Sequence, residues 1–173
     1  AILGDIHIQH NNKRATDKTF ELLDIMKPEH TMIHDIIDCE SISHWDMKDP
    51  FRMMQKEEEG TDNLSREIQD MLYWLDKYKR HNLVVVRSNH DDFFDRWLKL
   101  SDWRTVSNKK LYLEAANILA TEKVAQTKGV IPYYIENKFG DEIKTLGLDD
   151  SYRILEWELG MHGHLGASGS RGS

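Results

Sequence analysis

Three apolar runs in this sequence each end in a short polar segment that carries carboxylate, amide or imidazole groups. The clearest is Leu83–Val86, an aliphatic run typical of a strand buried on both faces, which leads into Ser-Asn-His-Asp at 88–91. The other two are residues 1–4, followed by Asp5 and His7, and Thr31–Ile33, followed by His34, Asp35 and Asp38. One such loop alone is typical of a capped turn. Because open α/β sheets place ligands at strand ends, three in order predict a metal site.

The rest of the chain predicts one α/β domain. Its 173 residues suffice for a single core, and 39% hydrophobic with 31% charged residues is ordinary for a globular protein. No apolar run approaches the roughly 18 residues of a membrane span, so we expect no membrane partner. The single Cys39 fits a reducing compartment, and we expect a cytoplasmic location. A net charge of −7 argues against nonspecific binding of nucleic acid by the whole surface, but permits a phosphate substrate beside bound cations.

Hydrophobic spacing predicts the helices and strands between these loops. We expect a helix capped by Thr16 or Asp17 and ended by Pro28, with Phe20 and Leu23 inward. Between the second and third strands we expect a helical insertion at about 40–81, interrupted near Gly60. Further helices are expected at 91–100 and 109–121, and antiparallel strands of a second sheet at 130–135 and 152–159, with turns near 140 and 147–150.

Carboxylate, amide and imidazole groups together form a mixed oxygen and nitrogen donor set. Imidazole suits zinc and iron, and carboxylate suits manganese and magnesium. Two cations bridged by a carboxylate can clamp a phosphoryl group and lower the pKa of a water. With a single cysteine, the chain has no Cys-rich structural zinc site.

Four segments resemble blocks of the calcineurin-like metallophosphoesterases. They are Gly4-Asp5-Ile6-His7, His34-Asp35-Ile36-Ile37-Asp38, Ser88-Asn89-His90-Asp91 and His162-Gly163-His164. The match runs from residue 4 to residue 164, nearly the whole chain. The resemblance implies a two-sheet α/β-β/α sandwich of the metallophosphoesterase type, here as one catalytic domain over residues 1–173 with its C-terminal part missing.

The resemblance also implies roles for individual residues. Asp5 and His7 would bind one metal ion, Asp35 would bridge two ions, and Asn89 and His162 would bind the second. His90 would act on the leaving oxygen as the catalytic acid, with Asp91 as its orienting partner, and Asp38 would be structural or supporting. The implied cofactors are two divalent ions, most simply Mn²⁺, with Fe, Zn or Mg as alternatives.

The sequence departs from the family pattern at three places. His34 and Ser88 replace glycines, and no Gly-His-x-His block follows residue 164. Either that block lies beyond Ser173 or the site is incomplete, and we expect truncation. His34, His164 and Arg171 are candidate substrate contacts, with loop structure or a flexible tail as the alternative for the last two.

The sequence therefore predicts a dinuclear metal-dependent phosphodiesterase, a nuclease that hydrolyses DNA with a metal-bridging hydroxide. The segment 41–50 and the glycine-rich tail at 166–172 are similar to a phage and prophage branch of the family that includes nucleases, which would place the protein in the host cytoplasm. A phosphomonoesterase acting on protein or a small molecule is the alternative enzyme. A non-catalytic scaffold with the same fold is the alternative outside enzymes, and the helical insertion offers a surface for a homo-oligomer.

Overall fold

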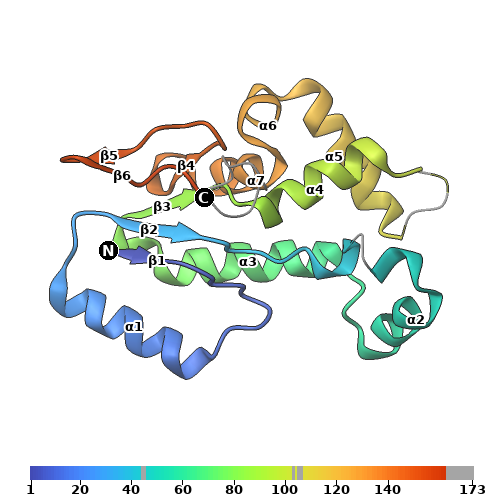
Figure 1. Ribbon diagram of the computed structural model, residues 1–173, viewed down its shortest axis with the longest axis horizontal. Helices are drawn as coiled ribbons and strands as arrows, with labels where there is room; N and C mark the ends of the chain where they lie inside the picture. Colours follow the sequence, from blue (N-terminus) through green and yellow to red (C-terminus); the bar gives the residue numbers. More distant parts are fainter. Residues whose placement is uncertain (44–45, 103, 105–106, 163–173) are drawn as a thin grey trace, which may run out of the picture.

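The computed structural model describes residues 1–43, 46–102, 104 and 107–162 and shows a mixed α/β fold (Figure 1). Four parallel strands form a sheet in the order β1-β2-β3-β4. The strands are β1 (Ile2–Leu3), β2 (Thr31–His34), β3 (Leu83–Val86) and β4 (Lys144–Leu146). A separate antiparallel hairpin is formed by β5 (Arg153–Ile154) and β6 (Trp157–Glu158).

The sheet confirms three expected strands and adds one. β2 and β3 pair in parallel, with Ile33 opposite Val85, and β1 pairs with β2. β4 pairs with β3 through Thr145 opposite Val85. This strand is only three residues long and two of them are polar, so the sequence gives no recognisable strand pattern there. Because all four strands are parallel, their carboxyl ends lie along one edge of the sheet, where the predicted ligands begin.

Most of the expected helices are present. They are α1 (Lys13–Met26), α2 (Pro50–Glu59), α3 (Leu64–Tyr78), α4 (Asn89–Leu100) and α5 (Lys109–Thr121). Two further helices, α6 (Lys123–Lys128) and α7 (Val130–Phe139), were not expected. The predicted cap of α1 is wrong. Asn12 caps this helix, its Oδ1 accepting a hydrogen bond from the Ala15 amide at 3.1 Å, so the helix starts before Thr16.

The predicted strand at 130–135 is also wrong, because this segment forms the start of α7. Its β-branched and aromatic residues favoured a strand, but Ile131, Ile135 and Phe139 recur every four residues and are buried together. Pro132 falls in the first turn of the helix, where its missing N–H costs little. Tertiary burial therefore overrides local β propensity here.

The two faces of the sheet are covered differently. Ile33, Leu83 and Val85 point into the large core, which is completed by residues of the helices that pack on this face. Met32, Val84 and Val86 point to the other face, against Tyr152 and Leu159 at the base of the hairpin. Within the described residues the second sheet is only the two-stranded antiparallel pair β5–β6, so the expected two-sheet sandwich is not confirmed.

Helices α2 and α3 occupy the segment at about 40–81 where a helical insertion was expected. α3 lies along the sheet (Figure 1) and contributes Met71 and Leu75, both fully buried, to the large core. α2 lies at one end of the molecule and exposes Phe51 and Met54. Thus α3 is part of the core, whereas α2 is a peripheral addition near the site.

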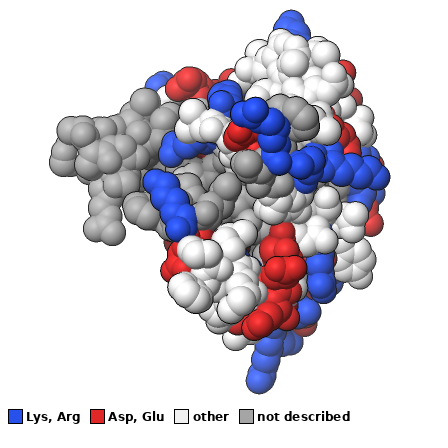
Figure 2. All heavy atoms as spheres, turned by 90° about the vertical axis from the view of Figure 1, so that its right-hand side faces the viewer, with Lys and Arg blue, Asp and Glu red and all other residues white. Residues whose placement is uncertain are grey.

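Both signs of charge are present on the end of the molecule that Figure 2 shows, where lysine and arginine side chains lie beside acidic ones. On this face neither sign of charge covers the surface alone. Among the helices that the structure describes, none is long and apolar enough to cross a membrane.

Candidate metal centre

The loops that follow β1 and β2 run side by side. The amide of His7 donates to the carbonyl of Asp35 at 2.8 Å, and the amide of Ile8 donates to the carbonyl of Ile36 at 3.1 Å. Ile36 and Ile37 are fully buried and anchor the second loop in the core. The sheet pairing therefore continues past the strands and holds the side chains of His7 and Asp35 next to each other.

Three of the predicted ligands adopt left-handed backbone conformations. The φ angles of Asp5, His7 and Asp35 are 50°, 38° and 53°. This region is sparsely populated by residues other than glycine, asparagine and aspartate, and such residues cluster at functional sites. The turns direct the three side chains out of the strands and toward the sheet edge.

The third loop is very short because α4 begins directly after β3. Ser88 caps the helix, its Oγ accepting from the amides of His90 and Asp91 at 3.2 and 3.3 Å. Asn89 and His90 therefore lie in the first helical turn, fixed to the end of the strand. A capped helix start holds these side chains more rigidly than a long loop would.

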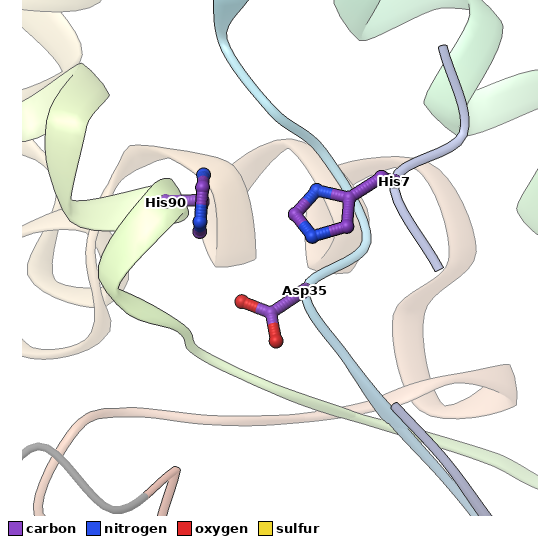
Figure 3. Close-up of side chains that lie close together, drawn as sticks. All are labelled: His7, Asp35 and His90. Atoms are coloured by element: carbon purple, nitrogen blue, oxygen red, sulfur yellow. The ribbon is translucent and has the colours of Figure 1, made fainter. Parts of the chain in front are cut away.

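Three of the converging side chains are His7, Asp35 and His90, which point toward one another in Figure 3. One ligand atom from each lies within 4.8 Å of the others, close enough for a shared cation. The rings of His7 and His90 meet edge to face, 4.8 Å between centroids. The resemblance placed His90 off the metals, so this geometry makes His90 a candidate for either role.

A second group lies on the other side of Asp35. His162 Nε2 is 3.0 Å from Asn89 Oδ1 and 3.2 Å from Asp35 Oδ1. His162 Nδ1 is 3.4 Å from His34 Nδ1. Burial is the main reason that the pKa of His34 lies below its usual value, and the neighbouring His162 adds to the effect. Asp35 thus touches both groups, as a bridging carboxylate must.

Asp38 links the site to its surroundings. Its Oδ1 lies 2.8 Å from His90 Nδ1 and 3.5 Å from His7 Nδ1, and its Oδ2 lies 3.3 Å from His10 Nε2. The contact with Asp38 is the main cause of the raised pKa of His90, and the same contact lowers the pKa of Asp38. Asp38 therefore orients His90.

Asp91 does not contact His90 in the way that we expected, and the prediction that it orients His90 is wrong. Its Oδ2 accepts a hydrogen bond from the Ser88 amide at 2.9 Å and closes the cap of α4. Burial raises the pKa of Asp91 to about 7. A carboxylate three residues after a cap residue faces that residue's amide, whereas Asp38 comes from the neighbouring strand end and faces the histidine.

The donor atoms fit bound cations. Asp35 Oδ1 and His7 Nδ1 are buried, and neither makes a hydrogen bond of good geometry with the described residues, although Asp35 Oδ1 lies 3.2 Å from His162 Nε2 and His7 Nδ1 lies 3.5 Å from Asp38 Oδ1. Buried polar atoms are normally hydrogen-bonded, so a cation between these groups would complete their sets of partners. Carboxylate, amide oxygen and imidazole nitrogen are the donors that Mn²⁺, Fe²⁺ and Zn²⁺ accept. The residues present therefore suit the divalent ions that the resemblance implies.

The remaining predicted residues fall into two groups. The Asp5 side chain is 89% exposed, with its Oδ1 3.9 Å from His7 Nε2, at the outer rim of the site. The predicted contacts His164 and Arg171 lie outside the described residues. His10 was not among the predicted site residues, and its side chain is 55% exposed, but its Nε2 lies 3.3 Å from Asp38 Oδ2 and 3.2 Å from Glu40 Oε2. The spacing of His7 and His10 along one loop was the available signal.

A hollow of about 540 Å³ opens beside the site between β1 and α1. Asp5, His7 and His10 line one part of it, and Asn12 and Thr16 line another. This volume is in the range of small-ligand sites. The hollow is therefore large enough for a nucleotide-sized group next to the converging side chains.

Comparison with known proteins finds a relative among bacteriophage proteins. The chain is similar to Protein A1 of Escherichia phage T5, with 30% identity over 188 aligned residues. The similarity is to a phage protein. The alignment covers 98% of this chain but 33% of Protein A1, so the chain spans about a third of the length of that relative. No protein-family profile matches the chain, and no solved structure matches it.

Proposed function

We propose that this chain is the catalytic region of a two-metal phosphodiesterase that hydrolyses DNA. The observation that carries the proposal is the arrangement around Asp35, which lies near His7 and His90 and also near His162, itself in contact with Asn89. Two adjacent sets of nitrogen and oxygen donors with a shared carboxylate suit a pair of cations. Asp35 Oδ1 supports the same conclusion, because it is buried and makes no well-formed hydrogen bond although it lies 3.2 Å from His162 Nε2.

Each residue has a role in the proposed reaction. Asp5, His7 and Asp35 would bind one cation, and Asp35, Asn89 and His162 would bind the other. When bound, divalent cations supply Lewis-acid stabilisation of the phosphoryl charge and a water of lowered pKa. His90 Nδ1 faces Asp38, so its other ring nitrogen, Nε2, is the one that can donate a proton to the leaving oxygen.

A diester substrate is favoured by the hollow between β1 and α1, because it gives room for a group on one side of the scissile phosphate. The similarity to a phage protein is in keeping with a nuclease of the phage branch that the sequence resembles.

We also propose that a further strand layer packs on the second face of the sheet and completes the sandwich. Met32, Val84 and Val86 on that face are covered by Tyr152 and Leu159 among the described residues.

Substrate assays with defined cations test the function. The protein is first stripped with a chelator and then supplied with Mn²⁺, Fe²⁺, Zn²⁺ or Mg²⁺. We expect hydrolysis of bis-p-nitrophenyl phosphate and of linear DNA, fastest with Mn²⁺, because a two-cation clamp serves the phosphodiester directly. Asp35→Asn is the negative control, since it keeps the shape of the side chain but removes its negative charge.

The outcomes separate the alternatives. Cleavage of p-nitrophenyl phosphate without cleavage of the diester or DNA would identify a phosphomonoesterase. Cation binding without turnover of any of the three substrates would favour a scaffold. Cleavage that persists in the chelated protein, or at full rate in Asp35→Asn, would contradict the two-metal proposal.

A further inference from the structure

Two histidines from distant parts of the chain face each other beside Asp35. His34 is the last residue of β2, and His162 follows the hairpin. Their rings lie with the two Nδ1 atoms facing each other 3.4 Å apart, 5.6 Å between centroids, and the ring planes meet at 28°. In the motif that the sequence resembles, the position of His34 is a glycine, so this contact belongs to this chain and not to the motif.

The two nitrogens of His162 have different surroundings. Nε2 lies against Asn89 Oδ1 and Asp35 Oδ1, at 3.0 and 3.2 Å, and both of these atoms are acceptors. In the protein without cations, Nε2 therefore carries the proton. Nδ1 is then the unprotonated nitrogen, and it accepts from the Nδ1–H of His34.

A cation that shares Asn89 and Asp35 with His162 must replace the Nε2 proton. The neutral imidazole then carries its proton on Nδ1, which needs an acceptor for its hydrogen bond. The lone pairs of the two ring nitrogens diverge, so His34, on the Nδ1 side, does not bind the same cation. His34 faces His162 at hydrogen-bond distance and can serve as that acceptor.

We propose that His34 is a positioning residue that fixes the ring and the tautomer of His162 for cation binding through Nε2. The inference rests on the metal site of the proposed function and adds a residue that the resemblance leaves without such a role. Before a cation binds, His34 donates its Nδ1–H to His162 Nδ1. When a cation takes the place of the Nε2 proton of His162, that proton would leave to solvent, the proton between the two Nδ1 atoms would pass to His162, and His34 would take up a proton from solvent at Nε2. Both rings would then stay neutral, and His34 Nδ1 would accept from His162. The pair exchanges donor and acceptor roles without moving apart.

Binding of Mn²⁺ to matched variants tests the proposal independently of activity. His34→Leu removes the nitrogen and keeps bulk, while His34→Asn keeps a polar oxygen near the position of Nδ1. We expect the affinity of one of the two cations to fall about 10–100-fold in His34→Leu, as when the outer partner of a ligating histidine is removed, and to recover in His34→Asn. His81→Leu is the control, because this buried histidine precedes β3 at the opposite end of the sheet and lies 3.7 Å from Asp24. Titration calorimetry and metal analysis after dialysis give the affinity and stoichiometry.

The results distinguish this inference from the proposed function. Wild-type protein that binds no Mn²⁺ would overturn both. Wild-type protein that binds two ions, with His34→Leu binding them equally well, would overturn the inference alone. An equal loss of Mn²⁺ affinity in His34→Leu and His34→Asn would also overturn the inference, because His34 would then contribute only by its shape.

The tautomer of His162 gives a second readout, through long-range proton–nitrogen NMR spectra of protein with and without Zn²⁺, a diamagnetic probe. We expect the proton of His162 to lie on Nε2 without the cation and on Nδ1 with it. In His34→Leu the Zn²⁺-bound form should lose the protected Nδ1–H signal. Retention of the Nε2 proton at saturating Zn²⁺, or an unchanged Nδ1–H signal in His34→Leu, would overturn the proposal.

Discussion

Asp35 has the most demanding position of the candidate ligands. Its side chain is buried, its backbone is in the left-handed region, and it lies within reach of His7, His90 and His162. A buried carboxylate without a full set of partners is costly unless a cation or a proton compensates its charge. Its neighbour His90 differs, because Asp38 already engages one of its nitrogens.

This difference predicts separable effects of two substitutions. His90→Ala should lower turnover of the diester about 10²–10⁴-fold, the range for loss of a general acid, and leave Mn²⁺ content nearly unchanged. Asp35→Ala should remove Mn²⁺ from the protein, because both groups of ligands lose their shared member. Metal analysis and steady-state rates on the same preparations provide the measurement. Equal loss of Mn²⁺ in both variants would make His90 a ligand, as its distance to His7 and Asp35 also permits.

The strand ends made most candidate ligands predictable from the sequence, whereas their partners were not predictable. A run such as Leu83–Val86 places the next residues at the sheet edge whatever the details of packing. That Asp38, and not Asp91, faces His90 depends on how two loops lie side by side. The contact between His34 and His162 depends on the path of the hairpin across 128 residues of sequence, which no local pattern encodes.

At the scale of elements, the hairpin β5–β6 positions His162. Glu158 ties its base together, accepting from the amides of Tyr152 and Gly160 at 2.8 Å each and from the hydroxyl of Ser151. These hydrogen bonds lower the pKa of Glu158 to about 2, and the one from Ser151 has the largest effect. The short strands alone would not hold this hairpin in place.

The lowered pKa of Glu158 predicts how the hairpin responds to acid. A carboxylate with a depressed pKa stabilises the folded form above its unfolded pKa, and this contribution disappears as the pH falls through its folded pKa. The hairpin contacts should therefore survive at pH 4 and be lost toward pH 2. The amide NMR signals of Tyr152 and Gly160 would report the midpoint. Glu158→Gln should lack this transition, and a midpoint near the usual pKa of glutamate would contradict the hydrogen-bond assignment.

Gly160 provides a second test of the hairpin. A Cβ at this position would clash with the carbonyl oxygen of Asp150 and lie 2.6 Å from the amide nitrogen of Tyr152. Gly160→Ala should therefore displace the segment that leads to His162 and weaken Mn²⁺ binding, while the main core stays folded. Gly140→Ala, where a Cβ would meet no atom within 4 Å but φ is positive, controls for backbone strain alone. Equal Mn²⁺ affinity in wild type and Gly160→Ala would show that the hairpin does not position the ligand.

Secondary structure was predictable where one periodicity dominated. α3 repeats its apolar residues at helical spacing and was expected, with the break before it at Gly60. α7 was mistaken for a strand because its β-branched and aromatic residues obscure the four-residue repeat of Ile131, Ile135 and Phe139. β4 was missed because three residues carry too little pattern to be distinguished from a loop.

For the whole molecule, α3 is as much part of the fold as the strands. Met71 is fully buried between α3 and the sheet, whereas Met54 on α2 is 53% exposed. Met71→Ala should lower the free energy of unfolding by about 2–5 kcal/mol through lost burial and a residual cavity. Met54→Ala should change it by no more than about 0.5 kcal/mol. Denaturant unfolding of both variants measures the contrast, and similar losses would place α2 in the cooperative core.

The left-handed turns at Asp5, His7 and Asp35 bear on how such a chain tolerates change. A left-handed backbone conformation is less favourable for these residues than for glycine. Glycine substitutions at the three positions should therefore be among the variants that a search for higher thermal stability selects. Glycine at any of these positions would raise the free energy of unfolding but would remove the side-chain donor atoms. A screen that ranks variants by melting temperature alone would thus select against the residues that the proposed function requires.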